Sequence, residues 1–183
     1  MPRQLADVID GVNNAELMSK VPRERYLSGD TIKRAAHRWA VAQGYGAGIA
    51  SGYSFNNSTR LICFSRETIE MQSPSLRELT NHHENLVTAS HRWAVSQGFF
   101  TGWLNGEKSG DNMGVACLKD LKADGSSVFQ YIAAADSDIE ASPDPLRRDK
   151  ILRFAIDRDY VAGVWNGEQS DGRKGITCIP RII

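Results

Sequence analysis

The chain has 183 residues, 41% of them hydrophobic and 24% charged, and its 22 basic and 22 acidic residues give a formal net charge of zero. This composition is typical of one compact globular domain, and because no basic stripe interleaved with aromatic residues is present, it argues against a nucleic-acid partner. No apolar run is long enough to span a membrane, and the N-terminus lacks the apolar core of a signal peptide, so we expect a soluble, cytoplasmic protein.

The sequence repeats itself in tandem. Residues 37–63 align without a gap with residues 91–117, and these align without a gap with residues 152–178. A register kept from a helical stretch through a glycine-rich stretch to a cysteine indicates one supersecondary unit used three times. The sequence therefore predicts a single domain, residues 1–183, of the α+β class, in which three tandem repeats pack into one pseudosymmetric core as a ring or a linear stack.

Every copy begins with a segment that has the spacing of an amphipathic helix. In the first copy Ser28 offers an N-cap and Gly44 ends the apolar periodicity, and Gly98 ends it in the second copy. In the third copy Ser142-Pro143 is a cap followed by a first-turn proline. The apolar face expected for this third helix consists of Leu146, Ile151, Phe154 and Ala155.

After each helix comes a glycine-marked pair of apolar runs, which predicts an antiparallel β-hairpin. A third strand is expected after the first two hairpins, at residues 68–71 and 128–132. The third copy ends without one, and N-terminal residues 4–9 are predicted to supply it and so close the ring. The predicted units span about residues 28–72, 82–133 and 142–183, with segment 1–27 closing the last one.

Three cysteines, Cys63, Cys117 and Cys178, occupy the same position in the three copies, each between apolar residues. An odd number of cysteines in apolar strands is typical of buried, reduced thiols. The alternative is a three-thiolate metal site, but no second ligand recurs beside any of them. The sequence therefore predicts no metal.

Arginine and histidine also recur on the predicted helices. Arg38, Arg92 and Arg153 lie off the apolar stripe, where they form salt bridges or bind a ligand. His37 and His91 would suit a catalytic pair, but Leu152 takes their place in the third copy. An apolar replacement favours half-buried packing residues over catalysis.

The loop after the first hairpin strand differs among the copies. Copies two and three share Asn-Gly-Glu and a later serine, whereas copy one reads Ser51-Gly52-Tyr53. Asn-Gly is a common turn, but aromatic, amide and acidic residues together are also the set that binds sugars. Since Trp103 and Trp165 differ by one residue in register, they are expected to point to opposite faces. The candidate ligand-binding residues are Trp103, Asn105, Gly106, Glu107, Ser109, Asp111, Trp165, Asn166, Gly167, Glu168, Ser170 and Asp171.

One segment resembles a known family. Residues 97–103, Gln-Gly-Phe-Phe-Thr-Gly-Trp, follow a predicted helix and precede a hairpin. They resemble the helix, Phe-Thr-Gly and Trp segment of the cyanobacterial mannan-binding lectins, which are also tandem repeats, although the family's Gly-Pro-Leu-Trp run has no counterpart here. The resemblance implies a non-enzymatic, lectin-like protein that binds carbohydrate through the loops of copies two and three, with a glycan or another small polar ligand as partner.

Two alternatives stay open. A protein-interaction or toxin-like module would use the same aromatic and loop residues to contact a protein partner. A glycoside-acting enzyme would use Glu107 and Glu168, but on separate repeats they are expected to lie further apart than the ~5–10 Å that this chemistry needs. No phosphate loop, nucleophile elbow or zinc motif is present. The sequence therefore predicts no catalytic residue and no cofactor.

Overall fold

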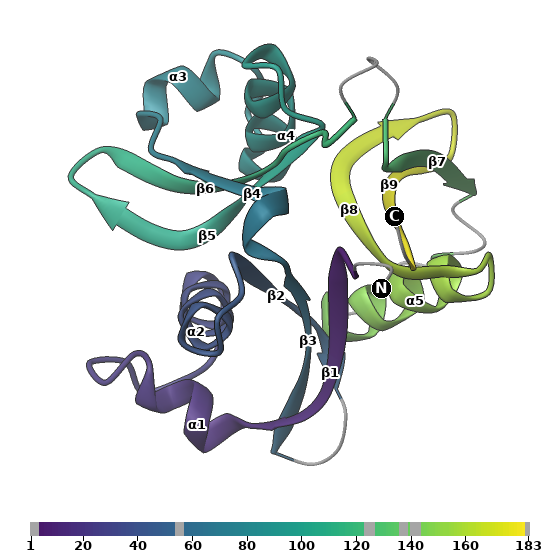
Figure 1. Cartoon of the computed structure of the whole chain (residues 1–183). Coiled ribbons are helices and arrows are strands. Elements are labelled where there is room, and N and C mark those ends of the chain that lie inside the picture. Colours follow the sequence, from purple (N-terminus) through teal and green to yellow (C-terminus); the bar gives the residue numbers. More distant parts are fainter. Residues whose placement is uncertain (1–3, 54–56, 123–126, 136–138, 140–143, 182–183) are drawn as a thin grey trace.

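The computed structural model describes residues 4–53, 57–122, 127–135, 139 and 144–181. Helices and strands mix along the chain, and the strands form three separate antiparallel sheets of three strands each (Figure 1). One helix, of 11 or 13 residues, packs on each sheet. The expected α+β fold with small antiparallel sheets is therefore confirmed.

The elements group into three units. We call β1 to β3 with α1 and α2 unit 1, β4 to β6 with α3 and α4 unit 2, and β7 to β9 with α5 unit 3. The bounds are β1 (Ala6–Asn13), α1 (Asn14–Ser19), α2 (Asp30–Ala42), β2 (Ala47–Tyr53), β3 (Ser58–Phe64), the 3-10 helix η1 (Arg66–Thr68), β4 (Ile69–Gln72), α3 (Leu76–Thr80), α4 (Leu86–Ser96), β5 (Thr101–Ser109), β6 (Asn112–Leu118), β7 (Gln130–Ala135), α5 (Asp144–Ile156), β8 (Tyr160–Ser170) and β9 (Arg173–Pro180).

The third strand of each sheet precedes its helix in the chain. β1 pairs with β3, β4 with β6 and β7 with β9, while the hairpin partners β2, β5 and β8 cover the opposite edges. The structure differs here from the pairing expected from sequence: β4 and β7 join the sheet of the following unit, and β1 joins unit 1 and does not close unit 3. The reason is that β1 already covers the free edge of β3, and β7 covers that of β9.

A glycine and a cysteine face each other at the same place in every sheet. In unit 2, Gly102 of β5 pairs with Cys117 of β6, and a Cβ on Gly102 would lie 2.6 Å from the Cβ of Ala94 in α4. The helix backbone therefore lies very close to the strand backbone at this point. The same pairing joins Gly48 with Cys63 beneath Ala40, and Gly163 with Cys178 beneath Ala155.

The buried core has a central part and three outer parts. The central cluster contains residues of all three units, among them Phe64, Leu118 and Ile179. Each outer cluster lies between the sheet and the helix of one unit and contains the cysteine of that unit. Strand alternation explains this division, because Cys117 and Leu118 are neighbours whose side chains point to opposite faces of the sheet. The three thiols are free and buried, as expected.

The helix details agree with the sequence at some points and differ at others. Trp93 and Phe154 are buried in their outer clusters, but the equivalent Trp39 is half-buried and donates a 3.1 Å hydrogen bond from Nε1 to Glu16. The N-cap of α2 is Gly29 and not Ser28. Leu146 is 49% exposed, so it does not belong to the apolar face of α5. Ser142 and Pro143 lie outside the described residues.

The helix of each unit also packs on a strand of another unit. Helix α2 contacts β5 of unit 2, α4 contacts β8 of unit 3, and α5 contacts β2 of unit 1. These three contacts form a closed cycle, which Figure 1 shows as three units placed around a common centre. Among the described residues, no helix has the length and apolar character needed to cross a membrane.

Candidate functional site

The two asparagines of the predicted ligand loops are buried. Asn105 is 2% exposed, and its Oδ1 accepts a 2.9 Å hydrogen bond from the backbone N–H of Glu107. Asn166 is 3% exposed and makes the same 2.9 Å bond with the N–H of Glu168. Each amide therefore shapes a local turn of its own strand, as Asx turns do. Their shared sequence has a structural explanation.

The two glutamates form ion pairs between units. Arg38 of α2 donates to both carboxylate oxygens of Glu107 at 2.6 and 3.0 Å, and Arg92 of α4 donates to those of Glu168 at 2.6 and 2.9 Å. The hydrogen bond from arginine lowers the pKa of each glutamate, and it outweighs the opposing effect of burial. The salt-bridge interpretation of Arg38 and Arg92 thus agrees with the geometry, and the carboxylates are occupied by the protein itself.

The glycines between them allow close contact with the helix of the preceding unit. Gly106 and Gly167 have φ values of 83° and 87°, which favour glycine. A Cβ on Gly106 would lie 2.7 Å from the backbone N of Arg34, and one on Gly167 would lie 2.7 Å from that of Thr88. The glycine carbonyls accept hydrogen bonds from these same two side chains, at 3.1 and 2.9 Å. Asn-Gly-Glu is therefore an inter-unit contact motif in units 2 and 3.

The two tryptophans point to opposite faces, as their register predicts. Trp103 packs against the central cluster, with its ring centroid 4.9 Å from that of Phe64. Trp165 packs against the outer cluster of unit 3, and Arg147 and Lys174 lie over its ring at 5.7 and 5.5 Å. Both indole Nε1 atoms are buried, and within the described structure neither has a hydrogen-bond partner.

The remaining predicted residues lie near the hairpin tips. Ser109, Asp111, Ser170 and Asp171 are all exposed. The tips of hairpins β5–β6 and β8–β9 lie on different sides of the molecule in Figure 1. The structure thus divides the predicted set into buried or ion-paired residues at the unit interfaces and exposed residues at two separate tips.

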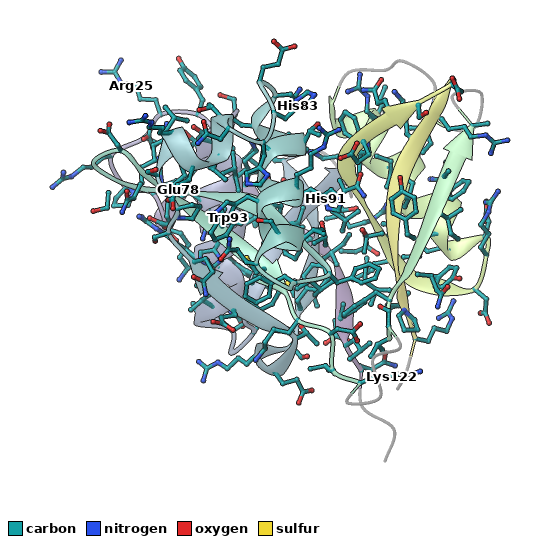
Figure 2. All side chains as sticks on the ribbon, turned by 90° about the horizontal axis from the view of Figure 1, so that it is seen from above. Arg25, Glu78, His83, His91, Trp93 and Lys122 are labelled. Carbon is teal, nitrogen blue, oxygen red and sulfur yellow. The ribbon has the colours of Figure 1, made fainter. Side chains whose placement is uncertain are left out.

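The histidines occupy a half-buried position beside the ion pairs. Figure 2 shows His91 on the side of α4 toward unit 3, with Trp93 on another side of the same helix. His91 Nδ1 lies 2.7 Å from Thr101 Oγ1, whereas no partner is described for the buried Nδ1 of His37. Burial is the main cause that lowers the pKa of both imidazoles.

The interface between units 3 and 1 is built differently. Unit 1 has Tyr53 at the position aligned with Glu107 and Glu168. The arginine of unit 3, Arg153, instead pairs with Asp149 of its own helix at 2.9 Å. Asp149 also accepts a 2.7 Å bond from Arg60 of β3, which in turn donates to Asp10 of β1 at 2.5 Å. A bridge through Arg60 therefore replaces the arginine–glutamate pair at this interface.

A cavity of about 520 Å³ lies where the three units meet. Its wall includes β2, β5 and β8, together with residues of α2, α4 and α5, and Gly48 to Gly52 of β2 form the longest continuous part. Three aligned sets of residues contribute to it. These sets are Lys33, Val87 and Arg148 on the helices, Ile49, Trp103 and Val164 on the strands, and Ala50, Leu104 and Trp165 one residue further along.

Sequence reasoning missed this cavity, apart from its two tryptophans. The alignment of the copies contains a signal for it, because Lys33 and Arg148 are cationic where Val87 is apolar. A helix position that is cationic in two copies and apolar in the third has different surroundings in the three units. Only the arrangement of the helices around a common centre shows that these three side chains border one space.

The cysteines have no common site. Cys63, Cys117 and Cys178 lie in three different outer clusters. Burial raises the pKa values of these thiols to about 12, about 12 and about 11, so they stay protonated at neutral pH. Within the described parts of the chain, no group of three or more His, Cys, Asp or Glu residues could hold a metal ion.

The fold and the site define an α+β protein with a cavity between three units, each made of a sheet and a helix. Comparison with protein-family models, with curated proteins and with solved structures gives no significant match. The resemblance of residues 97–103 to lectin repeats is therefore neither supported nor contradicted and stays a prediction.

Proposed function

We propose that the chain is a non-enzymatic ligand-binding protein, built from three copies of one unit around a pseudo-threefold axis, and that it binds a small molecule in the cavity on that axis. The threefold arrangement is supported by the gap-free alignment of residues 37–63, 91–117 and 152–178 and by the equal glycine–cysteine registers. The cyclic contacts of α2, α4 and α5 support it as well.

The observation that carries the ligand proposal is the cavity itself. A volume of about 520 Å³ falls within the ~300–1,000 Å³ that small-molecule sites occupy. Such sites are lined mainly by apolar and aromatic side chains with a few polar groups, and this wall has Trp103 and Trp165 beside residues such as Ser51 and Lys33. A ligand that binds this space in the folded protein alone stabilises the protein by mass action.

The hairpin loops are the weaker candidates. The Oδ1 atoms of Asn105 and Asn166 and the carboxylates of Glu107 and Glu168 already have partners within the protein, so a sugar hydroxyl would have to displace these partners. The Nδ2 of Asn166 has no partner among the described residues, but it is buried. Saccharide binding at the loops stays a prediction, and it can be tested by replacing only the exposed loop residues. Replacement of Ser109, Asp111, Ser170 and Asp171 by alanine leaves the unit interfaces intact and is the appropriate variant for oligosaccharide titration.

The cavity proposal is tested with a neutral apolar fluorescent probe, N-phenylnaphthylamine. Wild-type protein should bind it with a stoichiometry of one. Val87→Phe on α4 fills part of the cavity without changing its charge and should weaken binding, whereas Val95→Phe on the exposed face of the same helix should not. Circular dichroism and thermal melting check that both variants fold.

Two outcomes would contradict the proposal. One is the absence of saturable probe binding by the wild type at any accessible concentration. The other is equal affinity in wild type and a folded Val87→Phe variant, which would place the probe elsewhere. If oligosaccharides bind and the four-residue loop variant abolishes this, the loop prediction is supported, independently of the result for the cavity.

A further inference from the structure

Among the described residues, the charged side chains that border the cavity are all cationic. Lys33 of α2 and Arg147 and Arg148 of α5 line it, and no aspartate or glutamate of the described residues does. The chain as a whole has equal numbers of basic and acidic residues, so this wall does not simply reflect the composition. Lys33 pairs with Asp30 at 3.8 Å, and Asp30 also lies 3.2 Å from Lys108.

The polar wall is also uneven in position. Helices α2 and α5, which carry the cationic residues, both pack on β2 of unit 1. Unit 1 further supplies the uncharged polar residues Asn14, Ser28, Ser51 and Thr59, whereas Ser90 is the polar uncharged contribution of unit 2. The uncharged polar groups of the wall therefore come mainly from unit 1, and the cationic residues lie on the two helices that contact β2, whose Tyr53 is aligned with the ion-paired glutamates.

A second part of the wall is apolar and aromatic, and it adjoins Arg147, which lies 5.7 Å from the centroid of the Trp165 ring. It consists of Val87 on α4, Trp103 and Leu104 on β5, and Val164 and Trp165 on β8. A ligand that matches both parts of the wall has an apolar body and one negatively charged group. Cationic side chains in a partly water-excluded site attract anions more strongly than they would in bulk water.

We infer that the ligand of this cavity is an amphipathic organic anion, an apolar ring or chain that bears a carboxylate, and this inference rests on the proposed function. The carboxylate lies between α2 and α5 beside β2 and contacts Lys33 and Arg148. The apolar body lies against Val87, Trp103 and Val164. Unit 1, whose loop departs from the Asn-Gly-Glu pattern, is then the unit that provides the polar end of the site.

The test compares two matched ligands that differ only in charge. Naphthoate and naphthylmethanol displace the neutral probe from the wild-type protein, and naphthoate should bind at least about tenfold more tightly, as a charge-assisted hydrogen bond predicts. Added salt should reduce this preference. Lys33→Gln, Arg148→Gln and the double variant should each lower naphthoate affinity while naphthylmethanol affinity stays within about twofold.

Two further variants sharpen the result. Arg25→Gln and Lys122→Gln remove exposed charges that do not border the cavity, and they should leave naphthoate affinity unchanged. Val87→Lys places a cation at the position aligned with Lys33 and Arg148, so naphthoate should bind more tightly and naphthylmethanol more weakly. This gain cannot come from partial unfolding.

The outcomes separate the two proposals. Equal affinities for naphthoate and naphthylmethanol, or a naphthoate affinity that the Lys33 and Arg148 variants do not change, would overturn the anionic ligand class while probe binding still supported the cavity. If neither the probe nor either naphthalene compound binds the wild type, the proposed function itself is wrong.

Discussion

At the scale of single residues, one helix position explains why aligned side chains differ. His91 has Thr101 as partner, whereas the residue aligned with Thr101 is Ala47 in unit 1 and Ala162 in unit 3. His37 thus has no hydroxyl at this place, and Leu152 needs none. The histidine of unit 2 therefore has a polar partner, and the Nδ1 of the histidine of unit 1 has none described. In unit 3 an apolar residue, Leu152, takes this position.

We therefore expect His37→Leu to stabilise the protein. The change removes a buried nitrogen that lacks a described partner and copies the Leu152–Ala162 pair, so the free energy of unfolding should rise by up to ~1 kcal/mol. His91→Leu is the matched control and should lower it by ~1 kcal/mol, because Thr101 loses its partner. Urea denaturation measures both, and a destabilised His37→Leu would show that the imidazole has a favourable role.

The same histidines make stability depend on pH. Their pKa values are lowered from 6.5 by burial, so below pH 6.5 the unfolded chain binds more protons than the folded one. The free energy of unfolding should therefore have its full value above pH 6.5 and decrease as the pH falls below 6.5. Glu107 and Glu168, with pKa values lowered from 4.5, add a second loss below pH 4.5.

Denaturation at a series of pH values between about 8 and about 5 tests the histidine contribution. The His37→Leu variant should lose less stability over this range than the wild type. A wild-type stability that stays constant or increases on acidification would contradict the assigned direction of both pKa shifts.

At the scale of elements, the contact between helix and sheet depends on pairs of small residues. Gly102→Ala places a methyl group 2.6 Å from Ala94 Cβ, which neither backbone can easily accommodate. We expect a loss of ~1–3 kcal/mol in the free energy of unfolding. Ala94→Gly alone costs ~1 kcal/mol by helix propensity.

The double variant Ala94→Gly/Gly102→Ala distinguishes a steric cause from a general strand effect. It exchanges the two methyl groups, so its loss should be smaller than the sum of the single losses, as measured by thermal or urea unfolding. Strict additivity would show that the close contact between α4 and β5 is not what makes glycine necessary.

At the scale of the whole molecule, two of the three unit interfaces share one ion pair. Arg38 and Glu107 form it with side chains that are 42% and 35% exposed, so its contribution is limited by solvent. A double-mutant cycle with Arg38→Ala and Glu107→Ala should give a coupling energy of ~0.5–1 kcal/mol that decreases with added salt. A cycle for Arg153 and Asp149, neighbours on one helix, should give less.

Zero coupling between Arg38 and Glu107 would indicate that the shared Asn-Gly-Glu sequence serves another purpose than joining units 1 and 2. Such a result would favour the hypothesis that the loops bind a ligand. A measurable coupling supports the structural explanation and leaves the cavity as the better candidate site.

The sequence alone was sufficient for the three long helices and the hairpins, but not for the short helices α1 and α3 or for the N-cap of α2. Glycine and cysteine positions and apolar spacing predicted helices, hairpins and buried thiols, because the periods of helix and strand depend on neighbouring residues. The opposite orientation of Trp103 and Trp165 followed from the same rule. The third strands were predicted close to their observed positions, at residues 68–71 for β4 (Ile69–Gln72) and at residues 128–132 for β7 (Gln130–Ala135).

Only the tertiary structure decided which surfaces meet. A strand edge accepts any extended segment, so the partner of β1 depends on which edge is free and not on its own residues. The role of Glu107 depends on Arg38, which belongs to another unit and whose distance no local pattern encodes. The cavity is likewise a space between units, and it exists because Lys33, Val87 and Arg148 approach a common centre on three helices that lie far apart in the chain.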